Sequence, residues 1–274
     1  MNWIQGFLYG LLSGITEILP VSSQAHQRIL WQVFGQDRNP VTNLIVHVSV
    51  LIAIYIGCRG LILRMRRDQK VFAKRRHKTP NAELKNIYDL RMIRTSMIPM
   101  LLGMIALVFT RVWSDNNLLI ALFCLLGGIV LFIAERFPHG NKDARHMSVM
   151  DAAMFGLTSS FAVFPGMSRV GMSMSYATMR GVNKQQSLNW ALLLSIPALI
   201  VLCVFDVVDI VTMKGMVTNV SVIIGYFTAS FGAFIGSYLC VFFIRTFLNR
   251  SDTSIFAYYS WGLATLSFAL YLIS

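Results

Sequence analysis

The segment ITEILPVSSQAH, residues 15–26, places side chains capable of acid–base or nucleophilic chemistry inside an apolar stretch. Glu17 is the only carboxylate among the first 36 residues, and ionising it in apolar surroundings requires a partner cation. Four polar residues follow the proline of this segment: Ser22, Ser23, Gln24 and His26. The serines suit the N-cap of a following helix, whose free N–H groups also favour an anion. His26 lies about one helical turn after Ser23, so either is a candidate nucleophile or proton carrier.

A second polar interruption occurs in FGLTSSFAVFPGMSRVGMSMSYATMRG, residues 155–181. Pro165 and Gly166 break this apolar run, and Arg169 follows them. Its guanidinium offers five donors in a fork that matches phosphate oxygens. Glu17 and Arg169 together predict a polar cavity for an anion and a metal ion, and the simpler alternative is a buried ion pair between the two.

These polar segments belong to a chain with the composition of an integral membrane protein. Apolar residues make up 55% of the 274 residues and charged residues 13%, and the mean hydropathy is +0.61. Soluble domains carry about 25% charged residues. A helix needs roughly 20 apolar residues to cross a bilayer. The sequence therefore predicts an all-α protein with six transmembrane helices, at about 42–58, 92–112, 117–136, 187–211, 218–243 and 254–274.

The positive charge is concentrated in one connection between two of these runs. Residues 59–94 contain twelve Lys or Arg and three Asp or Glu, which gives +9 of the net +12 of the chain. Basic connections mark the cytoplasmic side and lie near anionic headgroups. We therefore expect a cytoplasmic loop at 59–91 and no nucleic-acid partner. Because successive spans cross the membrane in opposite directions, residues 114–117 would lie outside and residues 136–146 inside.

Two further segments must then enter and leave the membrane on one face. Residues 147–186 would enter from the cytoplasm as a re-entrant hairpin. Residues 1–41 would form a matching hairpin from the outer side, and one more full span is the alternative for them. Irregular backbone at membrane depth requires protein or a water-filled cavity around it, because lipid satisfies no N–H or C=O group.

The two hairpin segments resemble each other, since residues 10–23 align on residues 156–168 with one gap. Segments entering from opposite faces would be halves of an inverted repeat, and interrupted segments at matching positions point to a binding site near the midplane. We expect one polytopic domain made of three parts: repeat one at about 1–112, repeat two at about 147–243 and a last transmembrane helix at 254–274.

TEILPVSSQAH and FPGMSRVGMSMS resemble the two signatures of the bacterial undecaprenyl-diphosphate phosphatases of the bacitracin-resistance type. The likeness extends over most of the chain, including IPMLLGM at 98–104. That family's fold is similar to the one expected here, with six spanning helices and two re-entrant hairpins in an inverted repeat. The resemblance implies an inner-membrane enzyme, open to the outer face, that removes the terminal phosphate of a C55 polyprenyl diphosphate for cell-wall synthesis. Bacitracin resistance would follow, because the drug sequesters that lipid.

The resemblance also implies roles for individual residues. Glu17 would bind a divalent metal, Mg²⁺ or Ca²⁺, or act as an acid–base group, and Arg169 would clamp the diphosphate. Ser23 and His26 would supply the nucleophile and the proton relay. Ser168 and Ser173 would be supporting hydrogen-bond donors to the substrate. Three more residues would also bind the substrate: Ser22, Gln24 and Gly166.

The chain departs from the family's pattern at Ser13. The family carries a second glutamate there, one helical turn before the one that matches Glu17, and two such carboxylates could hold a metal together. Its loss supports a second hypothesis, a polyprenyl-phosphate transporter of the same fold with weak or no hydrolysis, because an inverted repeat also suits alternating access. A homodimer is considered for either function.

Overall fold

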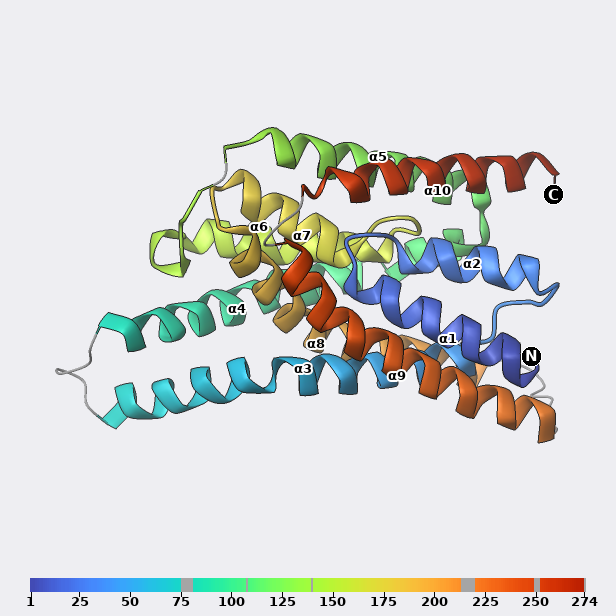
Figure 1. Cartoon of the computed structure of the whole chain (residues 1–274), viewed down its shortest axis with the longest axis horizontal. Helices are drawn as coiled ribbons and strands as arrows, with labels where there is room; N and C mark the ends of the chain where they lie inside the picture. The colour runs from blue at the N-terminus through green and yellow to red at the C-terminus, as the bar shows by residue number, and fades with distance from the viewer. Residues whose placement is uncertain (75–80, 107, 139, 213–219, 249–251, 274) are drawn as a thin grey trace.

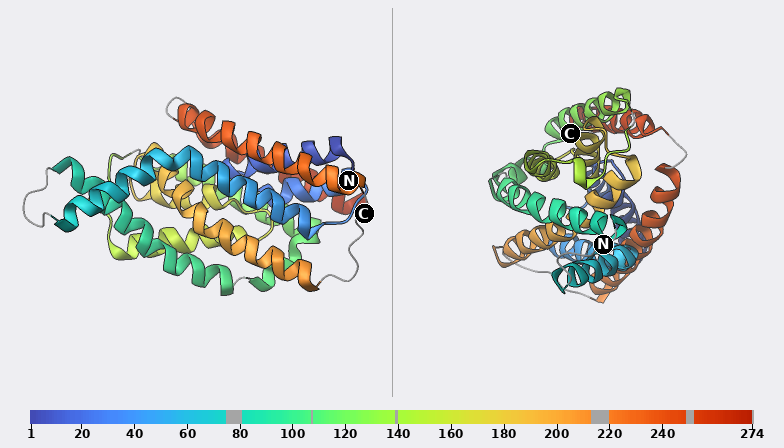
Figure 2. Two further views of the ribbon diagram at one scale, coloured as in Figure 1. Left: turned by 90° about the horizontal axis from the view of Figure 1, so that it is seen from below. Right: turned by 90° about the vertical axis from the view of Figure 1, so that its left-hand side faces the viewer.

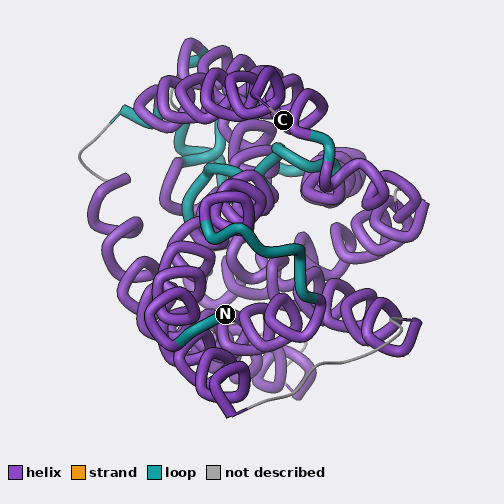
Figure 3. The backbone as a smooth tube through the Cα atoms, turned by 90° about the vertical axis from the view of Figure 1, so that its right-hand side faces the viewer, coloured by secondary structure: helices purple, strands orange, loops and turns teal. Residues whose placement is uncertain are grey.

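The structure, a computed structural model, describes residues 1–74, 81–106, 108–138, 140–212, 220–248 and 252–273, which form helices and turns without a strand (Figure 3). The α-helices of these ranges are α1 (Trp3–Ile18), α2 (Ser23–Val33), α3 (Pro40–Lys74), α4 (Asn81–Ala106), α5 (Asn117–Arg136), α6 (Val149–Ser160), α7 (Arg169–Met179), α8 (Lys184–Thr212), α9 (Val220–Leu248) and α10 (Ser254–Ile273). Three 3₁₀ helices lie between them: η1 (Val108–Asp115), η2 (Ala144–His146) and η3 (Phe161–Val163).

Five of these helices, α3, α5, α8, α9 and α10, are long and apolar enough to cross a membrane. A sixth span results if α4 and η1, bent by 49°, are one crossing. In Figures 1 and 2, α5 lies beside α10 on one flank and α3 beside α9 on another. Large apolar side chains on these flanks are exposed, for example Leu122, Phe231 and Leu266. Such a surface requires lipid around it, so the prediction of an all-α multi-pass membrane protein is confirmed.

The basic segment expected as a loop at 59–91 is largely helical, and that part of the prediction is wrong. α3 continues to Lys74 and α4 begins at Asn81, while residues 75–80 lie outside the described ranges. Lys and Arg are good helix formers, so a helix that leaves the apolar region has no reason to end at its first charged residue. The predicted span 92–112 also ends early, because α4 stops at Ala106 and the chain turns into η1.

The two predicted hairpin segments each form a pair of short helices, joined by residues 19–22 in the first segment and by η3 and a turn in the second. α1 and α2 have 16 and 11 residues, and α6 and α7 have 12 and 11. At 1.5 Å per residue, the longest of them reaches about 24 Å and falls short of the roughly 30 Å hydrocarbon core. Gly166 forms part of the second turn with φ +106°, where a Cβ atom would approach Ile120 O to 2.5 Å. The helix lengths favour re-entrant hairpins, whose depth in a bilayer stays a prediction.

The two halves of the chain pack against each other reciprocally. α1 of the first half lies on α9, and α6 of the second half lies on α4. At both crossings a glycine lets the backbones meet. A Cβ atom on Gly10 would lie 2.0 Å from Ala229 O, and one on Gly156 would lie 2.0 Å from Ser96 O. These two glycines are equivalent in the alignment of the hairpin segments. The first hairpin helix of each half thus packs on a long helix of the other half, which favours the inverted repeat. The repeat and its boundaries stay a prediction.

Replacing Gly10 with alanine is expected to lower the stability of the folded protein by about 1–3 kcal/mol, because the added methyl group overpacks the crossing of α1 and α9. Thermal unfolding in detergent measures the effect. Gly262→Ala on α10 is the matched control, since a Cβ atom there meets nothing within 4 Å. Equal melting temperatures for the two variants would contradict the close packing of α1 on α9.

Candidate active site

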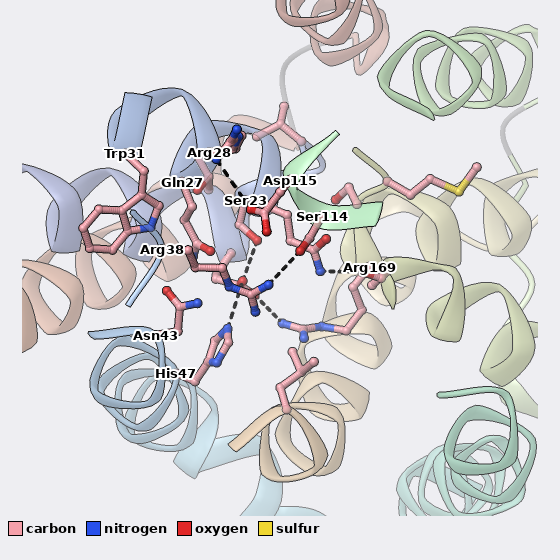
Figure 4. A pocket seen from close by; sticks show the side chains of 18 residues that line it. Ser23, Gln27, Arg28, Trp31, Arg38, Asn43, His47, Ser114, Asp115 and Arg169 are labelled. Atoms are coloured by element: carbon pink, nitrogen blue, oxygen red, sulfur yellow. Dashed lines mark hydrogen bonds and ion pairs between the residues drawn. The ribbon is translucent and has the colours of Figure 1, made fainter. Parts of the chain in front are cut away.

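A polar cavity of about 60 Å³ lies where the two hairpin turns meet (Figure 4). One side of the cavity is formed by the end of α1, by α2, and by the α2–α3 connection with the start of α3. The other side is formed by the end of η1, by η3, by the start of α7 and by Leu202 of α8. Side chains 130 and more residues apart in sequence therefore face one space. Both predicted polar interruptions contribute to it, through Glu17 and Ser23 from the first and Ser168 and Arg169 from the second.

Glu17 and Arg169 form the ion pair at the base of this cavity. Arg169 Nη2 donates to Glu17 Oε2 at 2.9 Å, and Arg169 Nε donates to Ser195 Oγ at 3.0 Å. Both charged side chains are buried, at 7% and 4% exposure. The guanidinium and the carboxylate are each other's partner in the interior, and removing either one would leave an uncompensated buried charge. The ion pair considered as the simpler alternative is therefore present, within a larger polar cluster.

The second oxygen of Glu17 holds the Ser23 hydroxyl. Ser23 Oγ donates to Glu17 Oε1 at 2.5 Å, and Ser23 also lines the cavity. Its position follows from local structure, because the Ser22 side chain caps α2 by accepting from Ala25 N, which places Ser23 in the first turn. A hydroxyl held on a carboxylate is an activated nucleophile, with an acceptor for its proton already in place.

His47 and Asp206 extend this cluster, and neither was among the residues singled out from the sequence. His47 Nδ1 lies 2.6 Å from Asp206 Oδ2, and His47 Nε2 lies 3.8 Å from Glu17 Oε1. Both are buried in the interior of α3 and α8. A signal did exist, because an ionisable residue inside an apolar span is costly and marks a functional site.

The structure does not bring His26 to the cavity. His26 Nδ1 lies 2.6 Å from the Ser22 carbonyl oxygen and therefore donates to it, which leaves Nε2 to accept from Tyr259 OH, also at 2.6 Å. The two rings stack with centroids 5.6 Å apart. Because of these contacts His26 joins α2 to α10, and Ser23 is the better-placed nucleophile.

The remaining predicted residues divide into cavity residues and structural ones. Gln24 and Ser168 line the cavity, and Ser168 also caps α7 by accepting from Gly171 N. Ser173 is fully buried, and its hydroxyl donates to the Arg169 carbonyl one turn back in α7. Ser22 and Gly166 lie outside this cavity and shape the two turns.

Two side chains of the cavity, Glu17 and Gln24, carry oxygen atoms of the kind that bind a divalent ion. Within the described ranges no three His, Cys, Asp or Glu side chains meet as a metal-binding group. Gln24 lines the same cavity, and its buried Oε1 has no hydrogen-bond partner. Carboxylate and amide oxygens are ligands that Mg²⁺ and Ca²⁺ take, and Mg²⁺ commonly completes its shell with water and substrate phosphates.

Two arginines that the sequence did not single out line the mouth of the cavity. Arg28 Nη1 lies 3.6 Å from Asp115 Oδ1, and Arg38 Nη1 donates to Ser114 Oγ at 2.7 Å. Figure 4 shows Arg38, Arg169 and His47 directed toward the same space from three separate elements. The cavity thus combines an activated hydroxyl with several cationic groups, an arrangement that suits phosphate chemistry.

Fold and site together define a class: multi-pass α-helical membrane proteins with a buried serine–carboxylate–guanidinium cluster where the turns of two helical hairpins meet. Within this class the chain belongs to the bacitracin resistance protein BacA family, whose sequence model matches residues 6–266.

Several relatives of known name are similar over nearly their whole length. An undecaprenyl-diphosphatase of Carboxydothermus hydrogenoformans is 29% identical over 262 residues, covering 95% of this chain and 94% of the relative. Undecaprenyl-diphosphatase 3 of Bacillus cereus is 27% identical over 272 residues, covering 98% of both chains. An undecaprenyl-diphosphatase of Prochlorococcus marinus is 28% identical over 264 residues, covering 94% of both.

Proposed function

We propose that this protein hydrolyses undecaprenyl diphosphate to undecaprenyl phosphate and inorganic phosphate. The observation that carries the proposal is the Ser23 hydroxyl held on Glu17 at 2.5 Å, beside the buried guanidinium of Arg169. The names of the family's similar members agree with it. None of those names describes a transporter, so the relatives do not favour the transporter hypothesis.

The geometry supports a two-step phosphoryl transfer. Ser23 Oγ attacks the terminal phosphorus while its proton passes to Glu17 Oε1, and the bond from that phosphorus to the bridging oxygen breaks. The lipid monophosphate leaves with the bridging oxygen. Water then attacks the phosphorus of the phosphoserine, and the bond from phosphorus to Ser23 Oγ breaks. Glu17 gives its proton back to Ser23 Oγ, and inorganic phosphate leaves with the oxygen and the two protons of the water. Arg169 faces the phosphate oxygens on which charge gathers, and its bonds to Glu17 and Ser195 hold it in place beforehand.

A divalent ion, Mg²⁺ or Ca²⁺, is part of this proposal. Glu17 and the unpartnered Oε1 of Gln24 would hold it, together with the diphosphate oxygens. Such an ion supplies charge neutralisation on the attacked phosphate. With Ser13 in place of a second carboxylate, we expect this chain to bind it weakly.

We further propose that the site opens to the outer face of the bacterial inner membrane. Three residues mark the mouth of the cavity: Arg38 just before α3, Asp115 at the end of η1, and Asp209 near the end of α8. These positions lie at the opposite end of the molecule from the basic extensions of α3 and α4 (Figure 1). Basic extensions belong on the cytoplasmic side. An enzyme there would recycle the carrier lipid of cell-wall synthesis and confer bacitracin resistance. The homodimer stays a prediction.

Purified protein in detergent, incubated with a short-chain prenyl diphosphate and Mg²⁺, is expected to release inorganic phosphate, measured by a colorimetric assay. EDTA is expected to suppress the release, and added Mg²⁺ to restore it. Absence of release from the wild-type protein would overturn the phosphatase proposal and direct attention to lipid transport in vesicles. Undiminished release in EDTA would overturn the metal requirement while leaving hydrolysis intact.

A further inference from the structure

The cavity carries more positive charge than its own acids neutralise. Arg28, Arg38 and Arg169 line it, whereas its two acids are Glu17 and Asp115. Glu17 is paired with Arg169, and Asp115 is paired with Arg28. Arg38 hydrogen-bonds the neutral Ser114 and reaches an acid only at 4.0 Å, at Asp209 on the rim. Guanidinium groups are always charged, so the cavity offers three fixed positive charges to an anion, and Arg38 has the longest ion pair of the three.

A buried donor without an acceptor lies on the same wall. Gln27 is 7% exposed, lines the cavity, and its Nε2 has no hydrogen-bond partner. An unpaired buried donor costs stability, which an incoming oxyanion would recover. Gln27 lies one helical turn beyond Ser23 on α2, and Arg28 is its neighbour, so the three side chains reach into the cavity from adjacent positions.

We propose that Gln27, Arg28 and Arg38 form a second phosphate subsite, which holds the lipid-linked phosphate while Arg169 and Ser23 engage the terminal one. This inference rests on the proposed function. The lipid-linked phosphate is the leaving group, and its charge grows as the bridging bond breaks. Arginines at the mouth would stabilise that charge and would distinguish a diphosphate from a monophosphate, which fills only one subsite.

Arg38→Ala and Arg28→Ala are expected to raise KM for the prenyl diphosphate by roughly 10- to 100-fold, the range for losing a charged hydrogen bond. Inorganic pyrophosphate is expected to compete better than orthophosphate with the wild-type protein, and this preference should fall in both variants. Arg38→Lys should recover part of it. Arg64→Ala is the matched control, because Arg64 is exposed on α3, lies outside the cavity, and its Nε donates to Gly60 O of the same helix.

Gln27→Leu separates binding from folding. Removing an unpaired buried donor should keep or raise the melting temperature, and it should also weaken pyrophosphate binding, measured by calorimetry in detergent. Pyrophosphate affinity and KM within twofold of wild type in both Arg38→Ala and Gln27→Leu would overturn the subsite. If the wild-type protein released no phosphate, calorimetry would still decide the subsite, because pyrophosphate binding requires no turnover.

Discussion

Ser23→Ala is expected to reduce phosphate release by a factor on the order of 10³ or more, because the variant lacks the attacking oxygen. The fold should persist, since Glu17 keeps its bond to Arg169. The measurement is steady-state phosphate release, together with a search for phosphorylated Ser23 by mass spectrometry after an acid quench. The wild-type protein should show the phosphoserine and the variant should not.

His26→Ala is the control that makes this result specific. His26 bonds Tyr259 and the Ser22 carbonyl and does not line the cavity. Release should therefore stay within about tenfold of wild type, while the melting temperature falls because α2 and α10 lose a buried polar contact. Tyr259→Phe, which removes one partner of that contact, should behave in the same way. Loss of release in His26→Ala with full release in Ser23→Ala would make His26 the nucleophile.

Arg169→Ala is expected to abolish hydrolysis and to destabilise the protein by about 3–5 kcal/mol, because it leaves the buried Glu17 carboxylate without its cation. Thermal unfolding and phosphate release measure the two effects separately. Arg169→Lys should recover more stability than activity, since a lysine restores the charge but does not reproduce the fork of donors that reaches Glu17 and Ser195.

The double variant Glu17→Ala with Arg169→Ala distinguishes a structural pair from a catalytic one. With both charges removed, much of the lost stability should return, because no uncompensated charge remains in the interior. Hydrolysis should not return, since the proton acceptor for Ser23 and the phosphate clamp are both absent. Substantial phosphate release from the double variant would show that the pair serves only the fold.

Much of the helical framework could be predicted from the sequence. The run at 117–136 coincides with α5, and the runs starting near 187, 218 and 254 match α8, α9 and α10 within a few residues. Length and hydropathy suffice for these helices, because a bilayer requires about 20 apolar residues with satisfied backbone groups. The prediction was wrong for the basic segment after residue 58, which was expected to be a loop. α3 continues there to Lys74, because a helix satisfies its own backbone hydrogen bonds and needs no bilayer around it.

The sequence alone determined the membrane class, the two polar interruptions and five residues that line the cavity: Glu17, Ser23, Gln24, Ser168 and Arg169. These follow from local properties, because a charge or a proline inside an apolar run is visible without knowing its neighbours. Only the tertiary structure decided the rest. It turned His26 toward α10, placed His47 between Glu17 and Asp206, and directed Arg28 and Arg38 to the mouth. The reason is geometric: which face of a helix meets the cavity depends on the rotation of that helix and on partners distant in the sequence, and no local pattern encodes either.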